Sequence, residues 1–394
     1  MTPVTPRFYV PGTPSPAVVS YALVKPRPAT SYWDYIQVEE LLALQGGLDR
    51  DESRLENDEV LFITVHQVFE LWLKLIYREL RASRDLFQRP FVEEQQLSGA
   101  VHSLERIATI FRVSTSHWEV METLNTREYL GFRDKLMGAS GFQSAQLRQI
   151  ELMLGLQESE RIALGAEGSY LEALKSADGR PSPAHARVTQ ALADRPTLKE
   201  AIEQWLQRTP IDGVGPGDPG AEAALERFAE NFLAAHGRAV DRSAARALEI
   251  AGSGADRARL AQRYEGEKQA VRAFLHPPES EGGARVKRIR CAMILIETYR
   301  ELPLLAWPRA LLDRLVEVEQ LFVVFRQRHA RMVERIIGRR TGTGGSAGVE
   351  YLDTTALKYR VFRDLWAIRT LQIPRELAPA LSNPEYYGFK SARA

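Results

Sequence analysis

The sequence predicts an all-α protein, with a helical core and a smaller, variable helical section inserted in its middle. Helical periodicity dominates the 394 residues, and no convincing run of alternating polar and apolar residues indicates a strand. Hydrophobic residues make up 44% of the chain and charged residues 26%, which is typical of a globular protein. The length is enough for one large domain or two ordinary ones.

The first half of the chain divides at proline, glycine and polar residues. Residues 1–30 are rich in proline and predict an extended arm. The expected helices that follow are 31–47, which paired glycines end, 56–87, 95–124 and 140–155. A turn is expected at Asn125–Thr126. We therefore assign residues 31–155 to the first half of the helical core.

The middle of the chain differs from both flanks. Helix breakers crowd the stretch 156–290, as in "TPIDGVGPGDPG" and "HPPESEGGAR", and predict short polar helices. The helical pattern resumes at Cys291 and ends at Gly338. We therefore expect a variable helical insertion over 156–290, the second half of the core over 291–375, and a C-terminal tail over 376–394.

Composition excludes several classes of function. The formal net charge is +1, so electrostatics favours neither nucleic acid nor an anionic membrane as a partner. Cys291 is the single cysteine, which rules out an intrachain disulfide and a cysteine zinc cluster and is typical of a cytoplasmic protein. No uninterrupted apolar run of membrane-spanning length is present, and the start lacks the order of a signal peptide.

The segment "NDEVLFITVHQVFELWLKL" places a histidine inside an apolar helix. Asn57 is the expected N-cap. Phe62, His66 and Phe69 share one helical face at spacings of 4 and 3. On this segment alone, a core histidine that bonds a backbone carbonyl is the more common case.

A second histidine lies in a longer apolar stripe. The stripe consists of Leu315, Val318, Phe322, Phe325, His329, Met332 and Ile336, at alternating spacings of 3 and 4. Neutral imidazole is the commonest protein ligand for metals and for haem iron. Such a stripe suits a porphyrin face, and it suits ordinary helix packing equally well.

Two further segments could bind an anion or an amino acid. Tyr129, Arg133 and Leu136 are expected on one helical face, where an inward arginine needs a carboxylate partner. The alternative is an exposed arginine paired with Glu128 or Asp134. The glycine-rich "RTGTGGSAG" at 340–348 could hold an anion or a ligand head group, or it could be a flexible linker. It is not a P-loop, because no strand precedes it and no lysine follows its glycines.

Taken together, these segments resemble the tryptophan 2,3-dioxygenase family, haem enzymes that open the indole ring of L-tryptophan. The similarity rests on "NDEVLFITVHQVFELWLKL", "REYLGFRDKLMGASGFQSAQLRQIE", "FRQRHARMVERIIGRRTGTGGSAGVEYL" and "YWDYIQVEELLALQ". It covers roughly 31–155 and 291–375. The resemblance implies a cytoplasmic oxidoreductase of tryptophan catabolism, in the kynurenine pathway, with one haem b per subunit.

The resemblance also implies roles for individual residues. His329 would be the proximal haem ligand, and His66 would be the catalytic distal histidine that bonds the indole N–H. Arg133 would clamp the substrate carboxylate, and Thr343 would contact the substrate head group. The other implied residues are Phe62, Tyr129 and Leu136 in the pocket wall, Trp118, Ser140 and Gly141 near the haem, and Tyr32, Tyr35 and Ile36, which would reach a neighbouring subunit's pocket in a homotetramer.

The expected reaction is L-tryptophan plus O2 giving N-formyl-L-kynurenine. One alternative is a haem-dependent monooxygenase that acts on a modified tryptophan in a biosynthetic pathway. Another is a non-enzymatic haem- or ligand-binding module, which would leave Arg133 and Thr343 without a purpose. The preference among tryptophan analogues does not follow from the sequence, since one methyl group in a pocket changes binding by only about 1–3 kcal/mol.

Overall fold

A computed structural model describes residues 31–136, 144–162, 170–176, 178–340 and 348–388. Within these ranges the protein is all-α, as predicted, and its β structure is limited to two isolated bridges, Lys175 with Pro181 and Ile211 with Val214. The chain forms two compact units, residues 1–55 and residues 56–394.

The first unit differs from its prediction. The single helix expected over 31–47 is two short helices, α1 (Tyr32–Tyr35) and α2 (Val38–Leu42), followed by the 3-10 turn η1 (Glu52–Arg54). Gln37 separates the helices with a φ of 54°, a left-handed conformation that interrupts an α-helix. Helices this short gain little from their own hydrogen bonds, so the local break costs little.

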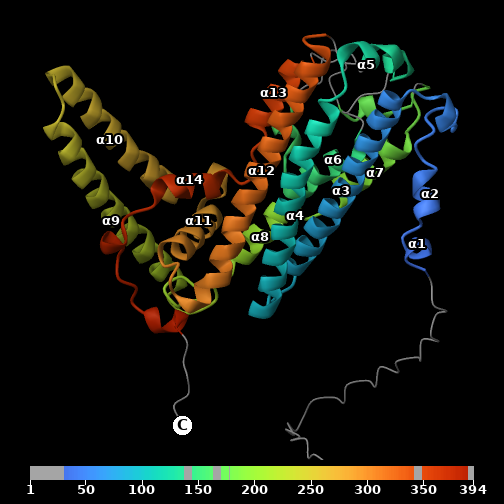
Figure 1. Ribbon diagram of the computed structural model, residues 1–394. Coiled ribbons are helices and arrows are strands. Elements are labelled where there is room, and N and C mark those ends of the chain that lie inside the picture. Colours follow the sequence, from blue (N-terminus) through green and yellow to red (C-terminus); the bar gives the residue numbers. More distant parts are fainter. Residues whose placement is uncertain (1–30, 137–143, 163–169, 177, 341–347, 389–394) are drawn as a thin grey trace, which may run out of the picture. The chain divides into compact units, whose positions relative to one another are not determined.

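Three long helices form the frame of the second unit. They are α3 (Asn57–Phe87), α4 (Glu94–Met121) and α12 (Ala306–Ile337), and α4 packs against both others (Figure 1). α3 and α4 confirm their predicted segments, whereas the helical stretch expected from Cys291 to Gly338 is divided, because one helix ends at Thr298 and α12 begins at Ala306. The predicted N-cap is wrong by one residue, because Glu56 holds that position and Asn57 begins the helix. Gly338 ends α12 with a φ of 62°, a conformation that favours glycine.

A shorter stretch connects α4 to the rest of the frame. It comprises α5 (Thr126–Phe132), the 3-10 turn η2 (Arg133–Leu136) and α6 (Ala145–Leu154). Asn125 caps α5, because its side chain accepts the N–H groups of Arg127 and Glu128. The α-helix expected to continue through Leu136 tightens to 3-10 geometry at Arg133, and Tyr129 and Arg133 still interact through their side chains.

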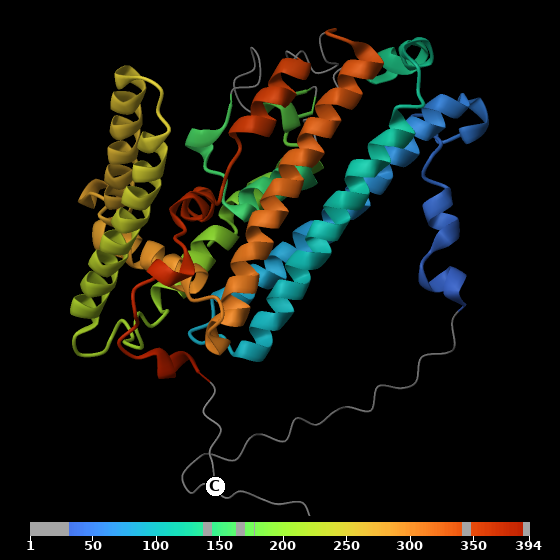
Figure 2. The same cartoon turned by 60° about the vertical axis from the view of Figure 1, so that its left-hand side comes forward.

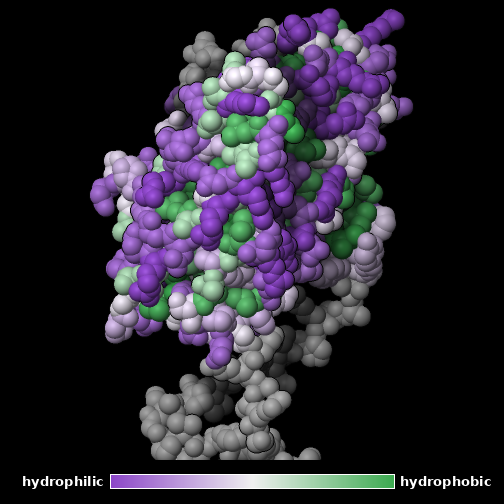
Figure 3. Space-filling view, turned by 90° about the vertical axis from the view of Figure 1, so that its left-hand side faces the viewer, coloured by the Kyte–Doolittle hydropathy of each residue, from purple (hydrophilic) through white to green (hydrophobic). Residues whose placement is uncertain are grey.

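The middle region contains longer helices than predicted. Its helices are α7 (Pro183–Ala193), α8 (Leu198–Gln207), α9 (Ala221–Glu249), α10 (Gly254–Leu275) and α11 (Gly283–Thr298). Only α7 and α8 are short. The helices α9 and α10 pack side by side (Figure 2). Their length follows from alanine-rich sequence, which favours helix, and the side chain of Ser253 caps the start of α10. Hydrophilic residues predominate on the face of the molecule seen in Figure 3.

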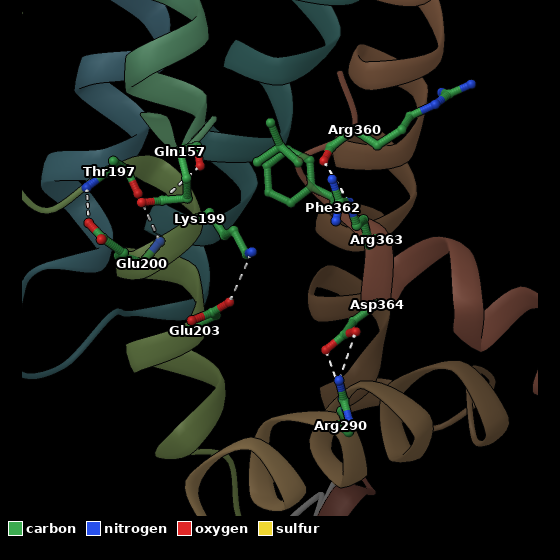
Figure 4. Close-up of polar contacts among 12 residues, drawn as sticks. Gln157, Thr197, Lys199, Glu200, Glu203, Arg290, Arg360, Phe362, Arg363 and Asp364 are labelled. Atoms are coloured by element: carbon green, nitrogen blue, oxygen red, sulfur yellow. Dashed lines mark hydrogen bonds and ion pairs between the residues drawn. The ribbon is translucent and has the colours of Figure 1, made fainter. Parts of the chain in front are cut away.

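The C-terminal part completes the second unit with α13 (Val349–Lys358) and α14 (Arg363–Leu371). The described 3-10 turns of this unit, besides η2, are Glu158–Glu160, Glu172–Leu174, Glu279–Glu281, Pro303–Leu305, Arg375–Leu377 and Pro384–Tyr387. Figure 4 shows two contacts that fix helix ends. Thr197 and Glu200 form a capping box at the start of α8, and Arg290 of α11 pairs with Asp364 of α14 at 2.9 Å.

Most buried apolar side chains form one core. It joins α3, α4 and α12 with parts of α8, α9, α10 and α11, so the middle of the chain shares the core of its flanks. One helix, α3, is long and apolar enough to span a membrane by length and composition, although Glu70 and Lys74 interrupt it. This is a weak sign, because the core helix of a soluble protein passes the same test, and α3 packs against α4, α6 and α8.

Candidate active site

His66 lies on α3 with one ring nitrogen committed to the backbone. Its Nδ1 lies 2.7 Å from the carbonyl oxygen of Phe62, one turn earlier. A carbonyl can only accept, so Nδ1 carries the proton and donates, which leaves the Nε2 lone pair as an acceptor. Burial lowers the pKa of His66, more than its hydrogen bond and Glu70 raise it, so the ring is neutral at pH 7.

Phe62 connects this histidine to two further aromatic rings. The Phe62 ring lies 4.1 Å from His66, 5.5 Å from Phe132 and 6.2 Å from Tyr129, measured between ring centroids. Leu136 is half-buried and packs against the same core. The structure therefore brings together Phe62, His66 and Tyr129, which the sequence analysis assigned to one pocket.

His329 lies on α12 within its predicted stripe, whose six apolar members are all buried. Its ring stacks on Trp118 of α4, with centroids 4.6 Å apart and planes inclined by 13°. Burial lowers the pKa of His329 to about 4, with smaller contributions from His66 and Arg326. Both imidazoles are therefore neutral at pH 7. Their two helices approach each other in this region, because the Phe69 ring of α3 lies 5.9 Å from the Phe325 ring of α12.

The surroundings of His329 fit a flat, apolar, metal-containing group. A neutral imidazole offers a lone pair to iron, and among the described residues no hydrogen bond engages this ring. Trp118 is buried, and no described group accepts a hydrogen bond from its Nε1. Aromatic carbon covers the same region, since Phe69 lies 4.1 Å and Phe325 5.4 Å from Trp118. Haem would suit these donors and this apolar wall.

Arg133 begins η2 and is half-buried beside the aromatic rings. Burial raises the pKa of the Tyr129 hydroxyl, and the charge and hydrogen bond of Arg133 partly oppose this. Lys135, two residues after Arg133, donates a hydrogen bond to Glu59 at 2.6 Å and ties η2 to the start of α3. A guanidinium held here can meet a carboxylate with two parallel N–H donors.

Polar contacts between helices hold these side chains in place. The Thr126 hydroxyl donates to the carbonyl of Ile336 at 2.7 Å, which joins α5 to the end of α12. Arg328 pairs with Glu122 at 2.7 Å and joins α12 to the segment after α4. These contacts fix the walls of the site relative to one another.

Some predicted site residues are not part of this arrangement as described. Ser140, Gly141 and Thr343 lie outside the described residues. Tyr32, Tyr35 and Ile36 belong to the first unit, where their exposed fractions are 76%, 77% and 43%.

The sequence analysis missed a buried ionic cluster around Glu151 of α6. Three arginines donate to this carboxylate: Arg148 at 2.9 Å, Arg161 at 2.7 Å and Arg326 at 2.7 Å. Together they lower the pKa of Glu151 far below its usual range, although burial opposes them. Arg326 could have been noticed, because it lies four residues after Phe322 and three before His329, beside the apolar stripe.

Comparison with known proteins identifies the family to which the chain belongs. The family model described as tryptophan 2,3-dioxygenase matches residues 23–372. A protein of Sorangium cellulosum named tryptophan 2,3-dioxygenase is 53% identical over 91% of this chain and 87% of its own length. Tryptophan 2,3-dioxygenase 2 of Ralstonia nicotianae is 48% identical over 91% of this chain and 97% of its own. A tryptophan 2,3-dioxygenase-like protein of Xanthomonas campestris is 46% identical over 68% of this chain and 98% of its own length.

Proposed function

Because the chain belongs to the tryptophan 2,3-dioxygenase family, we propose that it opens the indole ring of L-tryptophan with O2 to give N-formyl-L-kynurenine. The observation that carries the proposal is that α3 and α12 each carry a neutral imidazole where aromatic rings of the two helices meet, with a guanidinium beside Tyr129 in the same region.

The family is haem-dependent, and we assign one haem b per subunit to this site. His329 would be its iron ligand, with Trp118, Ser140 and Gly141 nearby. Bound haem supplies the redox-active iron that activates dioxygen. The protein contributes an apolar wall that excludes water, which protects reactive oxygen chemistry from side reactions.

The substrate would lie on the His66 side of the site. The unprotonated Nε2 of His66 can accept a hydrogen bond from the indole N–H, because Nδ1 is already held by the Phe62 carbonyl. Phe62, Tyr129 and Leu136 would line the indole pocket. Arg133 would bind the carboxylate, and Thr343 the head group.

We further propose that the protein is a cytoplasmic homotetramer that serves tryptophan catabolism. The exposed Tyr32, Tyr35 and Ile36 would reach a neighbouring subunit's pocket, which gives their apolar surface a partner.

The division into a core of 31–155 and 291–375, an insertion of 156–290 and flanking segments is also part of this proposal.

The test is turnover by the haem-loaded protein. The protein is reduced without oxygen and then given L-tryptophan and ¹⁸O2, and the product is analysed by mass and by the absorbance of the kynurenine chromophore. Two labelled oxygen atoms in the product are expected. Insertion of one oxygen would indicate a monooxygenase, and haem binding without turnover would indicate a binding module.

A further inference from the structure

The buried cluster around Glu151 brings guanidinium groups from distant parts of the chain onto one carboxylate. Its arginines Arg148, Arg161 and Arg326 have side-chain exposures of 4%, 7% and 10%, and that of Glu151 is 1%. The second carboxylate in contact, Glu158, is more than half exposed and bonds Arg161 and Tyr170. Among the described residues, the buried carboxylate of Glu151 thus contacts three buried guanidiniums.

This cluster is connected to the proposed iron ligand by a single helical turn. Arg326 precedes His329 by three residues on α12, so the two side chains leave neighbouring faces of the helix. Arg326 is fixed from three sides, because its Nη2 bonds Glu151 and its Cζ lies 4.2 Å and 4.9 Å from the ring centroids of Phe322 and Tyr359. It cannot turn its charge towards solvent without breaking these contacts.

We propose that the Glu151–Arg326 pair is a positioning and electrostatic element of the haem site, which fixes α12 and holds the positive charge of Arg326 beside His329. Positive charge in a poorly screened interior favours the reduced, less positive state of a nearby iron. Arg326 would therefore raise the reduction potential of haem bound at His329 and favour the ferrous state, and the negative charge of Glu151 would oppose this effect.

The inference rests on the proposed function, and its test uses the haem-loaded protein. Reduction potentials are measured by spectroelectrochemical titration for the parent, Arg326→Gln and Glu151→Gln. Loss of the cation is expected to lower the potential, and loss of the anion to raise it. The double variant E151Q/R326Q should lie between them. General loosening of the pocket would move both single variants in the same direction.

Matched variants separate charge from packing. Arg326→Lys keeps the charge and should stay closer to the parent than Arg326→Gln. Arg161→Gln leaves the Glu151–Arg326 pair intact and should lower the potential, which preserves the test if Glu151→Gln does not fold. Arg331→Gln is the control, because Arg331 lies on the same helix and is also ion-paired, but its side chain is 48% exposed and screened by water.

The outcomes distinguish this inference from the proposed function. Opposite shifts for Arg326→Gln and Glu151→Gln, with little shift for Arg331→Gln, support it. The inference is wrong if the parent binds haem through His329 but the cluster variants leave the reduction potential unchanged. It is also wrong if the direction of the shift does not follow the sign of the charge that was removed. A parent that binds no haem at His329 would overturn the proposed function, and this inference with it.

Discussion

Replacement of Arg133 by lysine tests the substrate pocket directly. Lysine keeps the positive charge but lacks the planar fork that bonds a carboxylate at two points. Loss of one partner of a buried, hydrogen-bonded charge pair costs about 2–5 kcal/mol. Arg133 is half-buried and also contacts Tyr129, so we expect a cost at the lower end, about 2–3 kcal/mol. This corresponds to a loss of roughly 30- to 150-fold in kcat/KM.

The assay compares two substrates and two sites. Steady-state kcat/KM is measured for L-tryptophan and for tryptamine, which has no carboxylate and should be a poor substrate of the parent. Arg133→Lys should impair L-tryptophan much more than tryptamine, with haem content near that of the parent. Arg127→Lys is the matched control, because Arg127 is an exposed arginine of the neighbouring α5. Equal losses for both substrates, or loss of haem, would refute the assignment of Arg133 as the carboxylate clamp.

Four other perturbations have defined outcomes. His66→Ala should lower activity without abolishing it and remove the disadvantage of 1-methyl-tryptophan; unchanged kinetics would exclude a role for His66. His329→Ala should fold, by circular dichroism, but retain little haem, and an unchanged Soret band would contradict the ligand assignment. Deletion of residues 1–40 should raise KM and weaken assembly in sedimentation, whereas a fully active monomer would argue against shared pockets. Glu151→Gln should lower the free energy of unfolding by about 3–5 kcal/mol at pH 7. The pKa of Glu151 in the folded protein is lowered from the ordinary 4.5, so the stability that the ionised carboxylate contributes is lost as pH falls below that value. The difference in free energy of unfolding between variant and parent should therefore narrow when unfolding is measured at acid pH.

Local pattern was sufficient for α3, α4 and most of α12, and for the placement of the two histidines on helices. The stripes of α3 and α12 repeat at helical spacing over many residues, and one buried face determines both the helix and the direction of His66 and His329. The pattern failed where short-range chemistry decides the backbone. Gln37 adopts a left-handed conformation that no side-chain pattern announces, and Arg133 lies where an α-helix tightens to a 3-10 turn.

The cluster around Glu151 was missed for a different reason. Its arginines lie at positions 148, 161 and 326, and a charged residue is normally expected at the surface. Their burial becomes apparent only when α6 and α12 are placed together. The glycines and prolines that flank α9 and α10 were taken as evidence of short elements, although they only mark where two long helices end and begin.

The placement of the site along the chain bears on how the protein is made. During synthesis His66 and Trp118 leave the ribosome early, and the remaining wall, with His329 on α12, follows more than two hundred residues later. A nascent chain that stops before α12 presents the stacking face of Trp118 without its partner ring. With His329 as the proposed iron ligand, haem would be acquired by the nearly finished polypeptide, and fragments from early termination would not hold it by that route.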